Sequence, residues 1–538
     1  MINYYFDSNA AGGGDGSKDK PFNMMSSMNS LAWPFNILVK RGSHFIDNFK
    51  LPTMTGSTQL CVMDNYGEGH APVFEPADYS IPVMDSAIVR NFHINGEFDT
   101  IISGFAYSAH RIWHLRVNSE GANDANVHVD GKFNFTINSM VRYECTSIYM
   151  DGQGGANITY RNDNMLVRGV TQRGGDTAVI MWCGSTYDLS AGQANAFKGR
   201  RCRIENCTAI GIAGDGFRLS NAEGMVGQET DPDYETSSRI VNCYSSQLGK
   251  YKLDDSSTAF DRARYHVGIW IYGCDNVAIE YCISDGGAWM HDCMGFDIDG
   301  KCSGCVVRYC ISTNNNGGFM MFTCTESDRL NPVTNSLAEW ENKLMSQKLG
   351  NVNNQCMYVL SYNDGVGRGR YAGRWTTFQF IGNVINAAIK NCTVVDMLSR
   401  FPSHFYLCTP TAKGMSTGLM GKYPSLVDST IFYHRYAHMT AGDAGFANNG
   451  GDTKMVWRNN IFWCPEDSGS RMNPTKGVLV TNRNVDPGLS NLTNSAPAGF
   501  NAALLVRLLQ NSKAVGRGSF NPSKDIWGSS GSNIGWQQ

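Results

Sequence analysis

Two acidic residues in the middle of the chain have the type and spacing for acid–base chemistry. Asp297 and Asp299 alternate with apolar residues in the stretch MGFDIDG. If this stretch is a strand, both side chains point to one face, with Cα atoms roughly 6.5 Å apart. Carboxyl groups about 5 to 9.5 Å apart can cleave a glycosidic bond, one donating a proton while the other attacks or activates water. The structural alternative is that Asp299 caps the turn at Gly300. Asp297 would then pair with Arg218 or Lys301.

Aromatic residues in a neighbouring segment add a binding surface to this candidate site. Trp270 and Tyr272 alternate with apolar residues in VGIWIYG, and rings of this kind stack on the C–H faces of sugars. The same rings equally suit packing under an insertion or against another subunit. A turn-capping role competes with catalysis for Asp215. The further candidates are Asp215 and His266 for catalysis, and Arg218, Asp292, Tyr265 and Lys301 for substrate binding.

A second chemistry uses a different set of residues. A polysaccharide lyase needs a base that takes the proton beside a uronate carboxylate and a cation that neutralises that carboxylate. His266 or Tyr265 would be the base, and Arg218 or Arg264 the cation. The sequence shows nothing like the clustered Asp array of a calcium-dependent pectate lyase, so the lyase ranks second.

The composition predicts an all-β protein and favours a neutral or weakly acidic ligand. Of 538 residues, 58 are Gly and only 17% are charged, a balance that favours turn-rich β structure over helix bundles. The formal net charge is −3, and no basic run offers phosphates a counter-charge, which argues against a nucleic-acid partner. No apolar run reaches the roughly 18 residues of a membrane-spanning helix, so membrane insertion is not expected.

Most of the 17 cysteines lie singly inside apolar strand patterns, where a free thiol behaves as a small buried hydrophobe. We therefore expect reduced, buried cysteines rather than a disulfide framework. Cys302 and Cys305 have the CxxC spacing, but no second pair or His cluster completes a zinc site. We expect neither a metal nor another cofactor.

A short phrase that repeats along the chain defines the fold. It reads apolar, any, apolar, two polar, then Cys, and it occurs as CRIENC, SRIVNC, VAIEYC, CVVRYC and AAIKNC. The first four of these end at Cys207, Cys243, Cys282 and Cys310, at intervals of 36, 39 and 28 residues. Such intervals accommodate three short strands with turns, but not βαβ units with helices. Each interval is therefore one coil of a solenoid of strands.

A second phrase, Gly followed by alternating apolar residues, feeds the next strand of the same coil. Its copies are GDGFRLS, VGIWIYG, MGFDIDG and GGFMMFT. Aligning the copies predicts that Phe217, Ile269, Phe296 and Phe319 point inward. It also predicts two outer columns, Arg218, Trp270, Asp297, Met320 and Ser220, Tyr272, Asp299, Phe322. Two carboxylates and two aromatic rings would then share one outer patch.

The Cys-ended and Asn-ended strands and the GFDIDG-type turns resemble right-handed parallel β-helix proteins of the pectate-lyase-like kind, such as phage tailspike depolymerases and secreted bacterial polysaccharidases. The resemblance extends from the opening YYFDSNAAGGGDGSKDKPF to a closing segment with NSKAVGRG, KDIWG and NIGWQQ, where Lys513 and Val515 replace the usual Pro and Ile. It implies an all-β, single-stranded, right-handed parallel β-helix. The predicted parts are a cap and first strands over 1–100, a body with loop insertions over 101–465, and a closing segment over 466–538.

Insertions that interrupt the repeat are where a rigid scaffold usually carries its binding site. They lie at 218–238, 247–266, 324–354 and 396–454. The third contains NSLAEWENKLMSQKLG, in which Asn335 is the predicted N-cap and Gly350 the stop of a short helix.

These features together predict a polysaccharide-degrading enzyme, foremost an endo-acting glycoside hydrolase on a bacterial surface or extracellular polysaccharide. The alternatives are the lyase and a non-catalytic glycan-binding or structural β-helix. We expect an extracellular location, either secreted or in a virion tail. The start without a signal-peptide pattern and the reduced cysteines favour a tailspike, which would be a homotrimer, whereas the closing segment favours a secreted bacterial protein.

Overall fold

The structure is a computed structural model, and it describes the chain in segments. For several strands it describes the backbone alone. The described residues are 1–32, 34–47, 61–70, 72–74, 86–90, 93–94, 112–116, 129–131, 134–138, 141–143, 147–151, 160–173, 178–184, 198–212, 214–249, 266–287, 293–324, 336–342, 345, 350–365, 376–398, 404–408, 422–436, 455–466, 479–481, 485–496 and 499.

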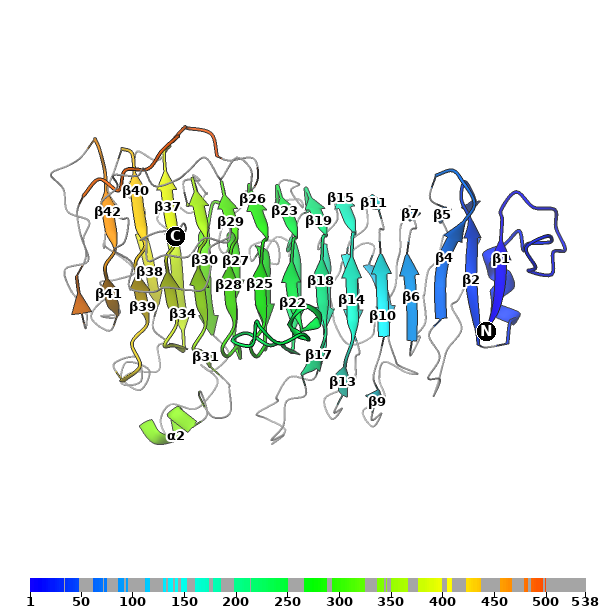
Figure 1. The fold of residues 1–538 in the computed structure, drawn as a ribbon, viewed down its shortest axis with the longest axis horizontal. Coiled ribbons are helices and arrows are strands. Elements are labelled where there is room, and N and C mark those ends of the chain that lie inside the picture. The colour runs from blue at the N-terminus through cyan, green and yellow to red at the C-terminus, as the bar shows by residue number, and fades with distance from the viewer. Residues whose placement is uncertain are drawn as a thin grey trace, which may run out of the picture. The chain divides into compact units, whose positions relative to one another are not determined.

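The chain divides into two compact units, Met1–Tyr244 with Tyr251–Ala263, and Ser245–Lys250 with Arg264–Gln538. In each unit, short strands pair in parallel with the strand one coil away, so that three sheets form, here named A, B and C (Figure 1). The chain visits A, B and C in turn and then returns to A. This arrangement confirms the predicted all-β parallel β-helix, while the three-part division of the chain stays a prediction.

The first unit holds the early strands of each sheet. In sheet A these are β1 (Ile2–Phe6), β2 (Phe35–Lys40), β4 (Cys61–Tyr66), β6 (Ser86–Arg90), β10 (Asn134–Asn138), β14 (Met165–Arg168), β18 (Arg203–Glu205) and β22 (Arg239–Val241). In sheet B they are β3 (His44–Phe45), β5 (Val73–Phe74), β7 (His93–Ile94), β11 (Val141–Tyr143), β15 (Thr171–Arg173) and β19 (Thr208–Ile210). In sheet C they are β8 (Ile112–Arg116), β12 (Ser147–Asp151), β16 (Val179–Trp182) and β20 (Phe217–Ser220).

The second unit continues the same pattern, and β23 (Tyr244–Ser246) lies where the units divide. Sheet A here has β25 (Ala278–Glu280), β28 (Val306–Arg308), β32 (Gln355–Met357), β36 (Ala388–Lys390), β39 (Leu426–Asp428), β41 (Val456–Arg458) and β43 (Leu479–Val480). Sheet B has β26 (Ile283–Asp285), β29 (Ile311–Thr313), β33 (Leu360–Tyr362), β37 (Thr393–Asp396), β40 (Ile431–His434) and β42 (Ile461–Trp463). Sheet C has β24 (Val267–Tyr272), β27 (Met294–Ile298), β30 (Gly318–Cys324), β34 (Thr376–Gly382) and β38 (His404–Cys408). Short extra pairs are β9 (Val129–Gly131) with β13 (Tyr160–Asn162), β17 (Gly199–Arg200) with β21 (Ala222–Glu223), and β31 (Asn351–Val352) with β35 (Val384–Ile385).

Residues with positive φ recur at five-residue intervals in sheets A and B. In four coils these residues are Arg201, Asn206, Gly211; Asn276, Tyr281, Gly286; Gly304, Tyr309, Asn314; and Asn353, Tyr358, Asn363. Each left-handed residue bends the chain, and the residue after it points into the interior. The three residues that follow form a strand whose middle side chain is also interior. The repeated Cys phrase is this five-residue unit, and its Cys is the interior corner residue.

The interior corner side chains bond to the backbone of the preceding coil. Cys310 Sγ accepts from the Cys282 N–H at 3.4 Å, and Thr430 Oγ1 accepts from the Cys392 N–H at the same distance. Asn460 Oδ1 then accepts from the Thr430 N–H at 2.9 Å. Cys, Thr and Asn are therefore interchangeable at the corner because each offers an acceptor to a buried N–H. The described thiols are free and buried, as predicted.

Three of the left-handed residues in the second unit are tyrosines whose rings stack. Tyr281 and Tyr309 have ring centroids 5.3 Å apart, and Tyr309 and Tyr358 are 5.6 Å apart. All three have positive φ, a conformation that costs on the order of 1 kcal/mol for a residue with a side chain. Their stacking offsets part of that cost, since aromatic pairs contribute about 0.5–1.5 kcal/mol beyond burial.

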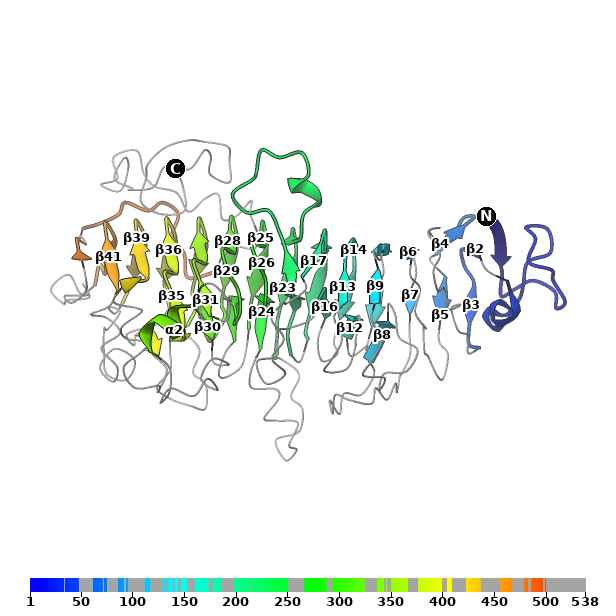
Figure 2. The ribbon, with the colours of Figure 1, turned by 90° about the horizontal axis from the view of Figure 1, so that it is seen from below.

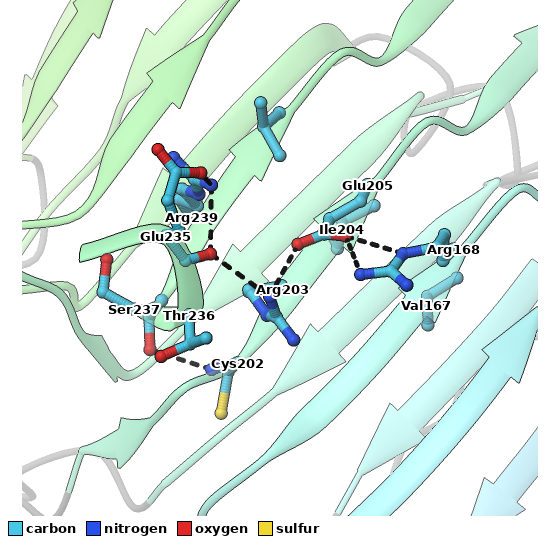
Figure 3. A network of polar contacts seen from close by, with 12 residues as sticks. Val167, Arg168, Cys202, Arg203, Ile204, Glu205, Glu235, Thr236, Ser237 and Arg239 are labelled. Carbon is cyan, nitrogen blue, oxygen red and sulfur yellow. Dashed lines mark hydrogen bonds and ion pairs between the residues drawn. The ribbon is translucent and has the colours of Figure 1, made fainter. Parts of the chain in front are cut away.

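An ion-pair network on the outer face of sheet A holds a loop of the first unit, which Figure 2 shows standing away from the strands. The loop contains a short 3₁₀ helix, η3 (Tyr234–Thr236). Glu205 binds Arg168 at 2.6 Å and Arg203 at 3.0 Å (Figure 3). The backbone carbonyl of Glu235 accepts from Arg203 at 3.2 Å and from Arg239 at 3.0 Å. Arg203, which is half-buried, and Arg239, which is buried, therefore anchor the loop through its backbone.

The chain's closing part lies across the outer face of sheet B in the second unit. Leu489, Leu492 and Ala496 pack on a buried cluster that includes Leu360 and Val395. The Thr493 N–H donates to Tyr362 Oη at 2.9 Å, and Arg435 and Asn363 both bond to Asn494. Figure 1 shows this segment, in orange to red, passing β42, β40 and β37. We call residues 485–496 the strap.

Helices are few in the described residues. A 3₁₀ helix, η1 (Met25–Ser30), buries Met25 and Met28 beside the first strands. The predicted helix in the third insertion is α2 (Leu337–Glu341), but its N-cap is Ser336 rather than Asn335. Ser336 Oγ accepts from the Glu339 N–H while Glu339 accepts from the Ser336 N–H, a reciprocal capping box that Asn335 cannot form. In the described parts of the chain, no helix is long and apolar enough to cross a membrane.

Corner substitutions test the interior ladder. Cys310→Asp should destabilise the protein by about 3 kcal/mol or more because it places an unpaired carboxylate in a dry interior. Cys310→Ser should cost less than about 1 kcal/mol, since its hydroxyl can accept from the Cys282 N–H as the thiol does. Chemical denaturation of the three proteins measures both values. Equal losses for Ser and Asp would contradict an acceptor role for this corner.

A charge in the strap tests whether it stabilises the second unit. Leu492→Asp should lower the melting temperature by several degrees, because the side chain would leave its apolar contacts on sheet B. Ser495→Asp adds the same charge at an exposed position of the strap and serves as the control. If both variants melt alike, the apolar contacts of the strap are not what stabilises the unit.

Candidate functional site

The outer face of sheet C in the second unit carries the predicted carboxylate and its aromatic neighbour. Strand pairing aligns Trp270 on β24 with Asp297 on β27, as predicted. The next pairing differs, because Asp297 aligns with Met321 and not with Met320. Gln379 on β34 continues the row.

The predicted register of β30 was therefore wrong by one residue. Met320 aligns with Phe296, which the sequence placed inside, and Phe322 aligns with Ile298. Met320 and Phe322 consequently belong to the inner columns, where Phe322 stacks on Phe380 at 5.1 Å. In the sequence FMMF the residues that would face inward and those that would face outward are all apolar, so the alternation of apolar residues does not select a register.

Asp297 is buried beside an apolar cluster. Its side chain is 2% exposed. Val267, Met294 and Met321 form a buried cluster, against which Trp270 packs while remaining partly exposed. The Asp297 carboxyl is therefore shielded from bulk water.

Asp299 follows β27 and is half-buried. Its Oδ1 accepts from the Gly300 N–H at 2.6 Å, which is the turn-capping contact that the structural alternative required. A carboxylate has about four acceptor sites, so this bond leaves room for a role in chemistry. The ring of Tyr272 is buried, and the Lys301 ammonium lies 5.7 Å from its centroid. Tyr272, Asp299 and Lys301 thus form one corner of the site.

The other predicted residues fall in three places. His266 is buried immediately before β24. Asp215 and Arg218 belong to the first unit, where Arg218 donates to Ser220 Oγ at 2.8 Å and lies 4.6 Å from the ring centroid of Trp182. Asp292 and Tyr265, like Arg264, lie outside the described residues. The structure thus places Trp270, Tyr272, Asp297, Asp299 and Lys301 on adjoining parts of β24, β27 and the turn after β27.

Sequence reasoning missed two buried acidic residues. Asp396 and His434 lie opposite each other on β37 and β40, and both are buried. The distance from Asp396 Oδ2 to His434 Nδ1 is 3.4 Å. Extending the coil alignment to TVVD and IFYH would have found this pair. Asp364 is buried inside the second unit, and burial raises its pKa to about 7. Its sequence, NDG, is that of an ordinary exposed turn, so no signal marked it.

No group of three His, Cys, Asp or Glu side chains in the described segments is arranged to hold a metal ion. Cys302 and Cys305 are both buried, and Cys305 Sγ contacts the Cys274 carbonyl at 3.3 Å. Burial raises the pKa of the Cys302 thiol well above its usual value, so this thiol stays protonated. Their surroundings are those of packing residues.

Comparison with known proteins gives structural likenesses only. No protein-family model and no curated protein sequence matches the chain. The selenomethionine derivative of the GH136 lacto-N-biosidase from Eubacterium ramulus is 14% identical, with a TM-score of 0.48 over 89% of this chain and 67% of that one. The native form of the same enzyme has a TM-score of 0.45, over 76% of this chain and 65% of that one. This chain thus spans about two thirds of that enzyme's length.

Two further solved structures are similar in the same sense. XylC in complex with xylose is 10% identical, with a TM-score of 0.45 over 91% of this chain and 87% of its own. Pectate lyase Pel9A is 12% identical, with a TM-score of 0.36 over 100% of this chain and 96% of its own. At such identities a likeness concerns the fold alone, and the chain's own strand pairing is what establishes the parallel β-helix.

Proposed function

We propose that this protein degrades a polysaccharide, as an endo-acting glycoside hydrolase whose site is the outer face of sheet C in the second unit. The observation that carries the proposal is the alignment of Trp270 with Asp297, together with the burial of Asp297 beside an apolar cluster. An aromatic ring beside a carboxyl group in dry surroundings combines sugar stacking with proton donation. A bacterial surface or extracellular polysaccharide, met outside the cell, is the substrate class included in the proposal.

The roles follow from the two environments. Asp297, away from water, is the proton donor to the glycosidic oxygen. Asp299, half-buried and held by the Gly300 N–H, is the second carboxylate, which attacks the sugar or activates water. Trp270 is partly exposed and offers its ring to the sugar face, and Lys301 lies at the Asp299 end of the site.

The lyase is the second candidate, with His266 or Tyr265 as its base. It predicts a different product, an unsaturated sugar that absorbs ultraviolet light. A glycan-binding β-helix without activity is the third, and it predicts binding with no new reducing ends. Purified capsule, exopolysaccharide and plant glycans, assayed for reducing ends and for ultraviolet absorbance, separate the three.

Asparagine substitutions test the two carboxylates. Asp297→Asn should fold normally and lose at least about a hundredfold of turnover, the usual scale for a positioned acid or base. Asp299→Asn keeps an oxygen for the Gly300 N–H and should lose a similar factor. The double variant should lose little more than either single one, because residues that act as a unit are not additive. Turnover is measured beside thermal melting and glycan binding, which should survive in all three.

Asp285→Asn is the matched control. Asp285 is a half-buried carboxylate of the same unit on sheet B, where it accepts from Thr313 Oγ1 at 2.8 Å. Its substitution should leave turnover unchanged. Full activity in Asp297→Asn would end the paired-carboxylate proposal, whereas an unfolded Asp297→Asn would show that this carboxyl is needed for packing.

A further inference from the structure

A buried polar network lies inside the second unit, between sheets B and C. Asn315 donates to Asp364 Oδ1 through its backbone N–H at 2.8 Å and its side-chain amide at 3.1 Å. Ser361 Oγ lies 2.7 Å from the other oxygen of Asp364. The Asn315 amide also reaches Ser312 Oγ at 3.0 Å, and its oxygen accepts from the Gly287 N–H at 2.9 Å. One Asn–Asp pair thus joins three successive coils.

The strands of the candidate site rest directly on this network. Gly268 on β24 is so close that a Cβ there would lie 2.0 Å from Ser284 Oγ. A Cβ at Gly295 on β27 would lie 2.1 Å from Ser312 Oγ and 3.1 Å from the Asn315 amide. Two residues after each of these glycines the same strands carry Trp270 and Asp297 on the outer face. Because Gly268 and Gly295 have no side chain, the backbone of β24 and β27 lies directly against the network. A displacement of the network would therefore displace the backbone that carries Trp270 and Asp297.

The charge of Asp364 is set by its surroundings. Burial raises its pKa to about 7, while hydrogen bonds from Asn315, Ser361 and Ser312 oppose the rise. The carboxyl therefore changes charge near neutral pH, and its charged form would have no counter-ion within the described network.

Several of the described residues on the elements around Asp364 are titratable, among them Asp396 on β37, which pairs with β33. Asp285 bonds to Thr313 and Asn314, and the Tyr362 hydroxyl bonds to the strap at Thr493. His266 and Cys293 precede β24 and β27 and are buried. An experiment on Asp364 must therefore separate its titration from theirs.

We propose that the Asn315–Asp364 pair positions β24 and β27, and that loss of the Asp364 proton loosens this support and so reduces activity at the outer face. Only the expected effect on activity rests on the proposed function. With the proton present on Asp364, every group of the network is neutral. Without it, a charge in the interior must draw in water or separate the turns at 314–317 and 361–365, and the strands above lose their support.

The test follows Trp270 emission from pH 5.5 to 9, taken as the difference between the protein and its Trp270→Phe variant. The signal should change with a midpoint near pH 7. Asp364→Asn imitates the neutral carboxyl and should hold the low-pH spectrum up to pH 9. Glycan turnover should fall several-fold between pH 6 and pH 8.5 in the unaltered protein and by less in Asp364→Asn.

Ser361→Ala and Asp396→Asn complete the experiment. Ser361 lowers the pKa of Asp364, so its removal should move the midpoint to higher pH, a result that requires no change at Asp364 itself. Asp396→Asn removes another buried carboxyl of the unit and should leave the midpoint unchanged. The same midpoint in Asp364→Asn and in the unaltered protein would overturn the inference. Absence of turnover with an intact Trp270 titration would overturn only the proposed function.

Discussion

The fold depends on one backbone constraint, the left-handed residues that recur at five-residue intervals in sheets A and B. Glycine and asparagine adopt that conformation at little cost, and most corners use them. Because the bend comes at a fixed interval, the residues between bends have fixed orientations, two inside and two outside. The interior corner, the outer charges and the pairing of each strand all follow from this spacing. Tyr281, Tyr309 and Tyr358 show that a strained backbone conformation is tolerated when stacking between neighbouring coils offsets its energetic cost.

Sheet C does not follow the five-residue spacing, and it carries the candidate site. Its strands in the second unit have five to seven residues instead of three, and β24 and β27 skip a pairing at their glycines. Sheet C therefore has room for longer outer rows, in which Trp270, Asp297, Met321 and Gln379 align from strand to strand. The regular sheets supply rigidity, since corner N–H groups such as those of Cys282, Cys392 and Thr430 are bonded to the next coil. The irregular sheet supplies the chemistry, with its strands supported from behind by Asn315 and Asp364.

The sequence predicts the regular parts better than the irregular ones, for physical reasons. CRIENC and its copies report backbone conformation directly, so the coils, the interior cysteines and the pairing of Trp270 with Asp297 could be predicted. GGFMMFT contains two equivalent alignments because all four residues after its glycines are apolar, and the wrong one placed Met320 beside Asp297. Asn335 and Ser336 are both good caps, and only Ser336 has Glu at the third position after it. The burial of Asp364 comes from neighbours 49 residues away, which no local pattern contains.

The strap changes how the second unit can come apart. In a bare solenoid each coil touches only its neighbours, so coils can unzip one at a time from a free end. The strap bonds Thr493 to Tyr362, a separation of 131 residues, and so spans several coils with one short segment. Such contacts raise the contact order, which slows folding, and they also mean that the last coils cannot fray unless the strap first detaches. Resistance of this unit to proteases would then be governed by the rate of that detachment rather than by the stability of any single coil.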